Sequence, residues 1–337
     1  MKHFFKKTWL VWIIVLTGCA TAGLQSFDTE ELFGKSLLVE RRADFNTDEA
    51  AWFREEVKPV LDQRCVVCHA CNDAPCQLKL TSAEGIMRGA NPQKVYHGTR
   101  LTAAEPTRLG IDADSTAEWR QMGFHPVLNE RTQSPEVNLA NSMIYQMLAL
   151  KKNAPAPEDV LLSDDYNLAL NRSQSCPTRE EFNEYAEEHP KWGMPYGLPE
   201  ISDSEYNTLV QWLRAGSPMS QPEPLSAETK STIKAWEDYL NDDSLKQQLA
   251  SRYMYEHLFL ASLYFSDEPL FRGIDPKQRP ENFFRLVRSY TPPGLPIKVV
   301  ATRRPYDDPG VQRIYYRLER IKETIVAKTH MPYRLND

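Results

Sequence analysis

The sequence lacks several features that would place a chain in a familiar class of protein. It has 46 acidic and 40 basic residues, and the net charge of -6 argues against nucleic acid as a partner. After the N-terminal region no apolar run is long enough to span a membrane, so lipid contact would need an anchor or an apolar surface. No separate second Cys-x-x-Cys occurs further along the chain to complete a zinc site with Cys65 and Cys68, since Cys68-His69-Ala70-Cys71 overlaps the first pair. What remains is an ordinary globular composition, 41% hydrophobic and 26% charged over 337 residues, which is enough for about two domains.

The N-terminus, residues 1–22, resembles an export signal, and a polar tether over residues 23–46 is expected to follow it. Lysines precede an apolar stretch, Trp9 to Leu16, that is too short to span a bilayer comfortably. Two processing sites compete. Leu16-Thr17-Gly18-Cys19 is similar to a bacterial lipobox, which would lipidate Cys19, whereas Ala20-Thr21-Ala22 fits cleavage by ordinary signal peptidase after Ala22. Either route places the mature chain in the periplasm, with a lipid anchor to the membrane in the first case.

The segment Cys65-Val66-Val67-Cys68-His69 has the spacing of a c-type haem attachment site. Two thiols three positions apart can add to the two vinyl groups of one haem, and the histidine that follows can bind the iron from one face. A thioredoxin-type redox pair would have no use for His69. We therefore expect one haem c per chain, held by Cys65 and Cys68, ligated by His69 and installed by the haem-attachment machinery of the cell.

The helices expected around this motif resemble those of a class I cytochrome c. Residues 47–64 predict a helix that leads into the motif. Further on, Gly193-Met194-Pro195 precedes the capping box Ser202-x-x-Glu205 and an amphipathic helix. A Gly-Met-Pro loop followed by a last helix is typical of that class. We therefore expect residues 47–217 to form one cytochrome c-like haem domain, with a long insertion between His69 and Met194.

Met194 is the candidate sixth ligand of the haem iron, because a thioether is a common axial ligand. A methionine that only fills the core is the alternative. His97, His125 and His189 could also reach the iron, and the sixth position could be open.

A second region, residues 225–337, is expected to combine helices with strands. The segment Leu245–Phe265 predicts a helix whose all-round apolarity favours a buried core element over an acyl-chain pocket. Residues 297–302 predict a strand, and residues 311–326 fit either a helix or an extended segment. We expect the whole fold to be mainly α, with the cytochrome c-like domain followed by an α+β region that is truncated.

Cys71, Cys76 and Cys176 remain after the haem and the export signal account for the other cysteines. The residues between the first two form a turn sequence, so a small disulfide loop from Cys71 to Cys76 is the candidate pairing. Cys176 would then be a buried free thiol. Pairing of Cys176 with Cys71 or with Cys76 is the alternative.

The stretch Val57–Leu80 around the motif and the segments Ala104–Leu109, Gly123–Glu130 and Lys328–Tyr333 carry a more specific resemblance. Together they are similar to bacterial fatty acid cis/trans isomerases. The haem motif alone is not specific to this family, whereas the Cys-rich stretch after His69 is. The resemblance runs over most of the mature chain. Since members of the family are longer, it implies that this chain holds their N-terminal part.

The resemblance implies an isomerase that converts cis-unsaturated fatty acids to trans without moving the double bond, and without ATP or NAD(P)H. Its substrates would be fatty acids or phospholipid acyl chains at the membrane surface, and its product would stiffen the membrane under stress. A C=C bond rotates only when its π order is lowered. A haem iron that withdraws an electron and returns it would do this with no net redox change, which makes His69, acting through the iron, the catalytic residue.

A periplasmic electron-transfer cytochrome c is the alternative function. It would need the haem and Met194 but no acyl pocket, and it leaves residues 225–337 without a role. Exchange of electrons with a partner, with no change to added cis fatty acid, would favour it. A non-catalytic fragment or haem-bearing lipoprotein is a third reading.

Overall fold

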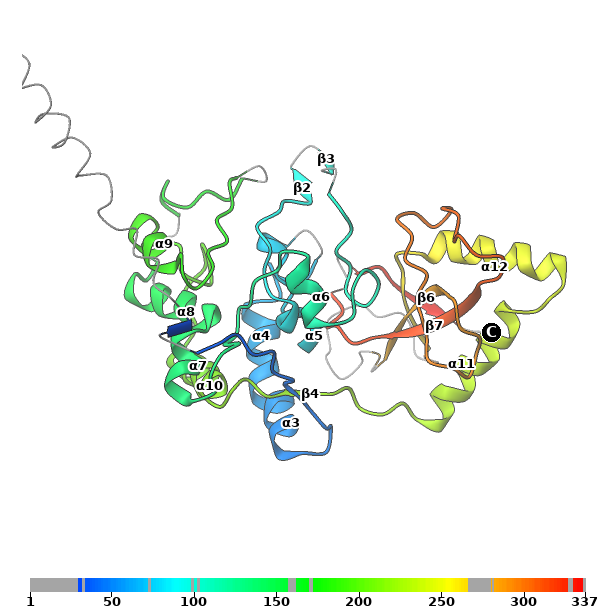
Figure 1. Cartoon of the computed structure of the whole chain (residues 1–337), viewed down its shortest axis with the longest axis horizontal. Coiled ribbons are helices and arrows are strands. Elements are labelled where there is room, and N and C mark those ends of the chain that lie inside the picture. The colour runs from blue at the N-terminus through cyan, green and yellow to red at the C-terminus, as the bar shows by residue number, and fades with distance from the viewer. Residues whose placement is uncertain are drawn as a thin grey trace, which may run out of the picture.

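The computed structural model describes residues 30–31, 34–71, 74–97, 100–101, 104–156, 162–169, 172–265, 280, 282–326 and 330–335. Most of the helices gather at one end of the molecule, and the largest sheet lies with α11 (Ala227–Leu240) and α12 (Leu245–Leu258) at the other (Figure 1). Cys19 and the rest of the expected export signal lie outside the described residues. Among the helices of the described ranges, none has the length and apolarity needed to cross a bilayer.

The helix that leads into Cys65 begins at Asp48, as the sequence predicts. Thr47 caps it, and Thr47 Oγ1 accepts a hydrogen bond from the Ala50 amide at 3.3 Å. α3 (Asp48–Trp52) continues through a π-helical turn, η1 (Phe53–Val57), into α4 (Lys58–Arg64). The π turn lies directly before Pro59, whose missing N–H and bulky ring disturb regular helical hydrogen bonds. The wider turn therefore accommodates the proline without ending the helix.

A helical core forms around this helix. Its apolar residues recur every three or four positions and are buried, namely Ala50, Phe53, Val57 and Leu61. This face packs against α10 (Asp203–Arg214), where the ring centroids of Phe53 and Trp212 lie 6.0 Å apart. The predicted capping box of α10 is confirmed, because Ser202 Oγ accepts from the Glu205 amide and the Glu205 carboxylate accepts from the Ser202 amide.

The other elements at this end are short. The helices are η2 (Pro75–Gln77), α5 (Ala83–Arg88), α6 (Thr116–Gln121), α7 (Pro135–Ala140), α8 (Met143–Asn153) and α9 (Phe182–Glu188). β1 (Arg42–Ala43) pairs in parallel with β4 (Met219–Ser220), and β2 (Tyr96–His97) pairs antiparallel with β3 (Arg100–Leu101). Through β4 the chain leaves α10 beside the start of α3.

The opposite end of the molecule is a four-stranded sheet packed against α11 and α12. The strands lie in the order β7 (Tyr315–Ile321), β6 (Phe283–Ser289), β5 (Ser262–Phe265) and β8 (Pro332–Leu335). β5 and β8 run parallel, and the other neighbours are antiparallel. Phe284, Leu286 and Leu318 of the sheet are buried together with Leu240 and Tyr255 of the two helices. A second core therefore lies between the sheet and these helices.

The prediction of a mainly α fold with a class I cytochrome c-like domain is wrong. Within the described residues, strands form the four-stranded sheet and two two-stranded pairs at the helical end. No local signal in the sequence predicts β6, and β7 lies in the segment where Leu318 and Ile321 follow a helical spacing. Pairing of β6 with β7 over 7 residues favours the strand over the helix. It satisfies the backbone hydrogen-bonding groups of both strands and buries one face of the sheet.

The helix predicted over Leu245–Phe265 is shorter and less buried than expected. α12 ends at Leu258, and residues 262–265 form β5 instead. Leu245, Leu249 and Tyr253 are 84%, 71% and 63% exposed, so α12 is not a fully buried core helix. The strand predicted over 297–302 is also wrong, since Val299 makes only an isolated bridge to Ser289.

The disulfide differs from the candidate pairing. Cys76 bonds to Cys176, with the two Cα atoms 5.6 Å apart, so the expected Cys71–Cys76 bond is wrong and Cys176 is not a free thiol. The Cys76 amide also donates to Gln174 Oε1 at 3.2 Å, so the segment that carries Cys176 lies directly against Cys76. A local turn sequence could not predict a partner 100 residues away.

Replacing Cys176 with serine is expected to lower the free energy of unfolding of the oxidised protein by roughly 2–5 kcal/mol, because the unfolded chain regains the freedom of a long loop. Cys71→Ser is the matched control, since it leaves the Cys76–Cys176 bond in place, and its effect should be smaller. Urea unfolding followed by circular dichroism measures both variants. A non-reduced peptide map in which Cys71 is linked to Cys76 would contradict the structure.

Candidate functional site

The Cys65–His69 motif lies on the turn that ends α4. The amides of Cys68 and His69 both donate to the Cys65 carbonyl, at 3.2 and 3.0 Å, and wind the motif tightly. Cys65 is partly buried, whereas Cys68 and Val67 are exposed. The two thiols and the imidazole that the sequence predicts to act together therefore lie on one turn.

A backbone carbonyl holds the His69 ring. Its Nδ1 lies 3.0 Å from the Leu78 carbonyl oxygen, and because that oxygen can only accept, Nδ1 carries the proton. The Leu80 amide donates to the His69 carbonyl at 2.9 Å and binds the same two segments together. Burial lowers the pKa of His69, and the nearby Arg172 cation adds to this effect. His69 is therefore a neutral imidazole whose Nε2 has the lone pair that a metal ion requires.

The Cys65 thiol is not activated by its surroundings. Burial raises the pKa of Cys65 to about 12, and Asp62, Cys68 and Glu205 add to this effect. Cys65 is therefore protonated at neutral pH. Since thioredoxin-type redox pairs depend on a thiolate with a lowered pKa, the environment of Cys65 weighs against that reading of the motif.

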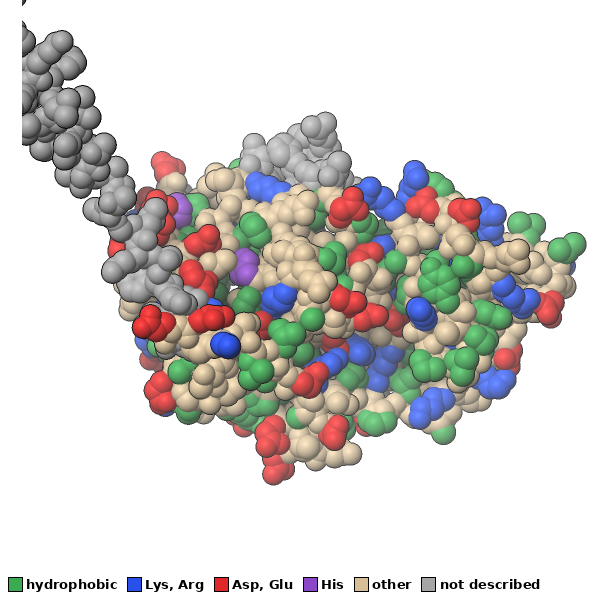
Figure 2. Space-filling view, viewed as in Figure 1, with side chains coloured by type: hydrophobic (Ala, Val, Ile, Leu, Met, Phe, Trp, Pro, Cys, Tyr) green, Lys and Arg blue, Asp and Glu red, His purple; other side chains and the backbone are tan. Residues whose placement is uncertain are grey.

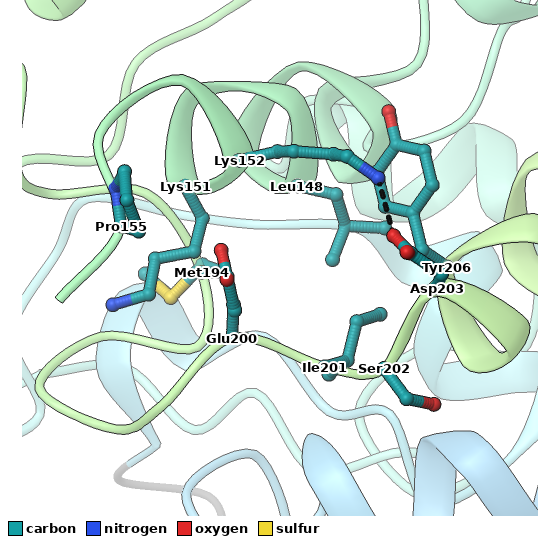
Figure 3. A pocket seen from close by; sticks show the side chains of 10 residues that line it. All are labelled: Leu148, Lys151, Lys152, Pro155, Met194, Glu200, Ile201, Ser202, Asp203 and Tyr206. Carbon is teal, nitrogen blue, oxygen red and sulfur yellow. Dashed lines mark hydrogen bonds and ion pairs between the residues drawn. The ribbon is translucent and has the colours of Figure 1, made fainter. Parts of the chain in front are cut away.

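Met194, the candidate sixth ligand, lines a cavity of about 370 Å³ at the helical end. The Met194 amide donates to the Met147 carbonyl at 3.0 Å, which ties the Met194 loop to α8. In Figure 3 Met194 and Lys151 lie at one end of the cavity, and Tyr206 and Asp203 lie at the other. The cavity is therefore formed between α8, the Met194 loop and the first turn of α10.

Two sets of contacts connect this cavity with the haem motif. Arg64, which precedes Cys65, donates to Glu205 at 2.8 Å, and the next residue, Tyr206, lines the cavity. Arg172, whose charge acts on His69, lies 5.0 Å from the ring centroid of Tyr196, two residues after Met194. The motif and the Met194 cavity are therefore linked through Glu205 and Arg172, whereas Cys65, Cys68 and His69 do not line the cavity themselves.

A buried lysine lines this cavity. Lys151 is 1% exposed, and its Nζ makes no hydrogen bond to any part of the chain that the structure describes. Burial lowers the pKa of Lys151. Its ammonium lies 5.8 Å from the ring centroid of Tyr166, and the charge of Glu200 partly opposes the effect of burial on its pKa. Since these interactions replace hydrogen bonds only in part, an anionic group in the cavity would stabilise this side chain.

The histidines considered as alternative ligands have other surroundings. His189 stacks on Trp192, with ring centroids 4.0 Å apart. His125 pairs its backbone with Ala90, and its partial burial lowers its pKa. The side chain of His97 lies outside the described parts of the chain. Across the described ranges, no group of three or more His, Cys, Asp and Glu side chains is arranged to hold a metal ion directly.

A buried ion pair lies next to the loop that holds His69. Lys79 follows Leu78, and its ammonium group pairs with Glu323. The two side chains are 6% and 14% exposed, and Thr81 Oγ1 also donates to Glu323, at 3.0 Å. Burial opposes the charge on Glu323, but the nearby cations, led by Lys79, outweigh it and keep the pKa of Glu323 below its usual value. This pair joins the loop after the motif to the segment that follows β7.

A second cavity, of about 270 Å³, opens beside this pair, between the loop after the motif and the sheet. Its wall includes Cys71 and Lys79 from the loop, the end of α12, β6 and residues 299–302. Figure 2 shows basic side chains gathered where the helical end and the sheet end of the molecule meet. Basic and apolar side chains line the cavity together, which suits a ligand with an anionic end and an apolar body.

The part of the chain that contains the sheet and most of the second cavity also matches a known family. The family model described as fatty acid cis/trans isomerase (CTI) matches residues 104–337. Comparisons with curated proteins and with solved structures found no match. The match defines the protein as an isomerase that acts on fatty acids. The chain belongs to the fatty acid cis/trans isomerase family, which confirms the resemblance seen in the sequence. Cys65, Cys68 and His69 lie before the matched residues.

Sequence reasoning missed the polar residues of the second cavity. Lys79 lies in the stretch after His69 that resembles the family, but no local spacing indicates that Glu323 is its partner. The arginines of β6 likewise follow no recognisable motif. Only the fold brings these side chains together.

Replacing Lys79 with methionine is expected to lower the free energy of unfolding by roughly 3–5 kcal/mol, because Glu323 would be left buried with a charge and without its main partner. Lys234→Met is the matched control: it breaks an exposed ion pair with Asp238 and should cost less than about 1 kcal/mol. Urea unfolding monitored by circular dichroism measures both changes. Similar small losses for the two variants would show that the Lys79–Glu323 pair does not stabilise the fold.

Proposed function

We propose that this protein converts cis-unsaturated acyl chains to their trans isomers, without moving the double bond, with a haem c bound through Cys65 and Cys68. His69 would be an axial ligand of the iron. The observation that carries this proposal is the hydrogen bond from His69 Nδ1 to the Leu78 carbonyl, because it leaves Nε2 for the iron. Family membership supports the reaction, and the motif supports the cofactor.

The surrounding residues fit such a group. The Cys65 and Cys68 thiols lie on one turn with His69. Met194 would offer a thioether to the iron, and the Lys151 ammonium in the same cavity, which makes no hydrogen bond within the described chain, would neutralise one of the haem propionates. When bound, the haem iron would supply reversible withdrawal of one electron from the double bond, which lowers its π order and lets the carbon–carbon axis turn with no net redox change.

The residues of the chain would hold and orient the substrate and His69. Burial keeps His69 neutral and therefore able to bind a metal. The Lys79–Glu323 pair fixes the segment whose Leu78 carbonyl orients the imidazole. The second cavity, which Cys71 lines two residues after His69, would bring an acyl chain beside the motif and shield it from water.

The reaction would take place in the periplasm at the membrane surface, after the haem-attachment machinery has modified the exported chain. The support for this location is the export-signal pattern of residues 1–22, with Cys19 as the lipidated residue if the lipobox is used. The acyl chains of membrane lipids, or fatty acids released from them, would be the substrates. Trans chains pack more densely than cis chains, so the product would reduce membrane fluidity during stress.

His69→Ala is expected to abolish formation of the trans isomer while the protein still folds, because the ligand of the iron is removed. The test incubates the protein with cis-9-hexadecenoate and analyses the fatty acid methyl esters for the trans product. His257→Ala is the matched control, since His257 is an exposed histidine whose Nδ1 also contacts a backbone carbonyl, that of Tyr253 at 2.7 Å. It should retain full activity.

Trans product from His69→Ala would contradict the proposed role of the haem. A wild-type protein with a normal c-haem spectrum that forms no trans product but exchanges electrons with a partner would favour the electron-transfer cytochrome instead.

Met194→Ala is expected to retain the covalently bound haem but to lower its reduction potential, because thioether ligation raises the potential of haem iron. Met143→Ala is the control, since Met143 is a buried core methionine whose loss should reduce stability and leave the potential unchanged. Potentiometric titration of the visible spectrum measures both variants. An unchanged potential in Met194→Ala would leave Met194 as a residue that only fills space.

A further inference from the structure

The second cavity contains a buried cation that forms no direct ion pair with any carboxylate of the described residues. Arg288 lies on β6 and is 6% exposed. Its Nη1 donates to the backbone carbonyl of Asp307 at 2.9 Å and its Nη2 to Thr302 Oγ1 at 2.7 Å, whereas Nε has no partner within the described chain. The Asp307 carboxylate pairs with Arg304 at 2.8 Å, and Arg288 acts on it only from a distance, where it helps to lower the pKa of Asp307. No described carboxylate forms a direct ion pair with Arg288. A buried guanidinium group without a counter-charge is costly.

The neighbouring cations of the cavity are neutralised. Arg108 and Arg285 each have a carboxylate partner, at 2.8 and 2.6 Å, and Lys79 has the partner described above. Arg108 also donates to the Thr302 carbonyl at 2.8 Å, so two guanidinium groups meet at one threonine. Of the arginines that line the described cavity, Arg288 is therefore the one whose charge is available for an anionic ligand.

From Arg288 the cavity wall becomes apolar along β6. Leu286 lies two residues earlier in the strand and therefore on the same face, and Phe259 joins it from beyond the end of α12. Phe283 lies opposite Ile321 in the antiparallel pair, so both face the other side of the sheet from Arg288 and Leu286. Ile321 also lines the cavity, which therefore borders both faces of β6. At the usual rise of a strand, Ile321 lies about 17 Å along the sheet from Arg288.

The far end of the cavity borders the loop after the haem motif. Glu323 follows Ile321 by two residues and pairs with Lys79, which is next to the Leu78 carbonyl that holds His69. Cys71, two residues after His69, lines the same cavity. A chain whose charged end lies at Arg288 would therefore run toward the motif.

We infer that Arg288 binds the carboxylate of a free fatty acid whose acyl chain occupies this cavity and points toward the His69 loop. This rests on the proposed function and adds the form and orientation of its substrate. The volume of about 270 Å³ is near the lower end of ligand pockets, roughly 300–1,000 Å³, and suits one acyl chain better than the two chains of a phospholipid. Tyr255 supports the site, since the Arg288 guanidinium lies 5.1 Å from its ring centroid.

Binding of cis-9-hexadecenoate to the purified full chain tests this inference. Isothermal titration calorimetry below the micelle concentration measures affinity without requiring turnover. Arg288→Gln removes the charge and is expected to weaken binding roughly 10- to 100-fold, and Arg288→Lys should retain part of the affinity. Arg313→Gln, at an exposed arginine that pairs with Asp243 and does not line the cavity, should bind like the wild type. The methyl ester, which lacks the carboxylate charge, should bind equally weakly to the wild type and to Arg288→Gln.

Equal affinity of the folded wild type and Arg288→Gln for the acid would overturn the inference, and so would a methyl ester that binds the wild type as tightly as the acid. If Arg288→Gln does not fold, the affinities of the wild type and of Arg288→Lys for the acid and for the methyl ester are compared instead. Tighter binding of the acid supports the inference, and equal binding of acid and ester overturns it. Tighter binding of 1-palmitoleoyl lysophosphatidate that depends on Arg288 would assign the site to a lipid phosphate and overturn the carboxylate assignment. His69→Ala separates this test from the proposed function, because it should bind the acid normally although it forms no trans product.

Discussion

The buried ion pair between Lys79 and Glu323 is the contact on which the arrangement of the candidate sites depends. Lys79 belongs to the loop that orients His69, and Glu323 belongs to the segment that follows β7. Next to the pair, the Thr324 amide donates to the Thr81 carbonyl at 2.8 Å, so backbone contacts reinforce the charges. These contacts between residues 79–81 and residues 323–324 thus connect the haem motif with the wall of the second cavity. The position of β6 relative to His69 follows from them.

Lys151 and Arg288 are buried cationic side chains, one in each of the two cavities. Each side chain is almost fully buried, and each has a nitrogen without a partner in the described structure. Proteins of marginal stability carry such costs mainly where function requires them. A bound anion would neutralise each cation and stabilise the folded chain. These two nitrogen atoms are therefore the positions at which the proposed haem propionate and the proposed fatty acid carboxylate would bind.

The sequence correctly predicted features that depend on residues close together in the chain. Cys65, Cys68 and His69 lie together because their spacing alone places them on one turn, and the Ser202–Glu205 capping box formed because its partners are three residues apart. The family resemblance, and with it the enzyme class, was also correct. The haem, its sixth ligand and the periplasmic location stay predictions.

Contacts between distant parts of the chain were not predictable in the same way. The pairing of β6 with β7 overrode a helical spacing, and the Cys76–Cys176 bond overrode a nearby turn sequence. Arg288 has no neighbour in the sequence that reveals its burial. In each case the partner lies far along the chain, so no periodicity or motif reports it. The error in fold class has the same origin, because a sheet is assembled from such pairings.

During folding, the Cys76–Cys176 bond must compete with faster alternatives. Cys65, Cys68, Cys71 and Cys76 lie close together in the sequence, and short loops close at a lower entropic cost than a loop of 100 residues. In an oxidising compartment, bonds among the clustered thiols therefore form first and are resolved by thiol–disulfide exchange. The supply of reductant or disulfide isomerase, rather than the stability of the finished fold, then limits how many chains keep Cys65 and Cys68 as thiols.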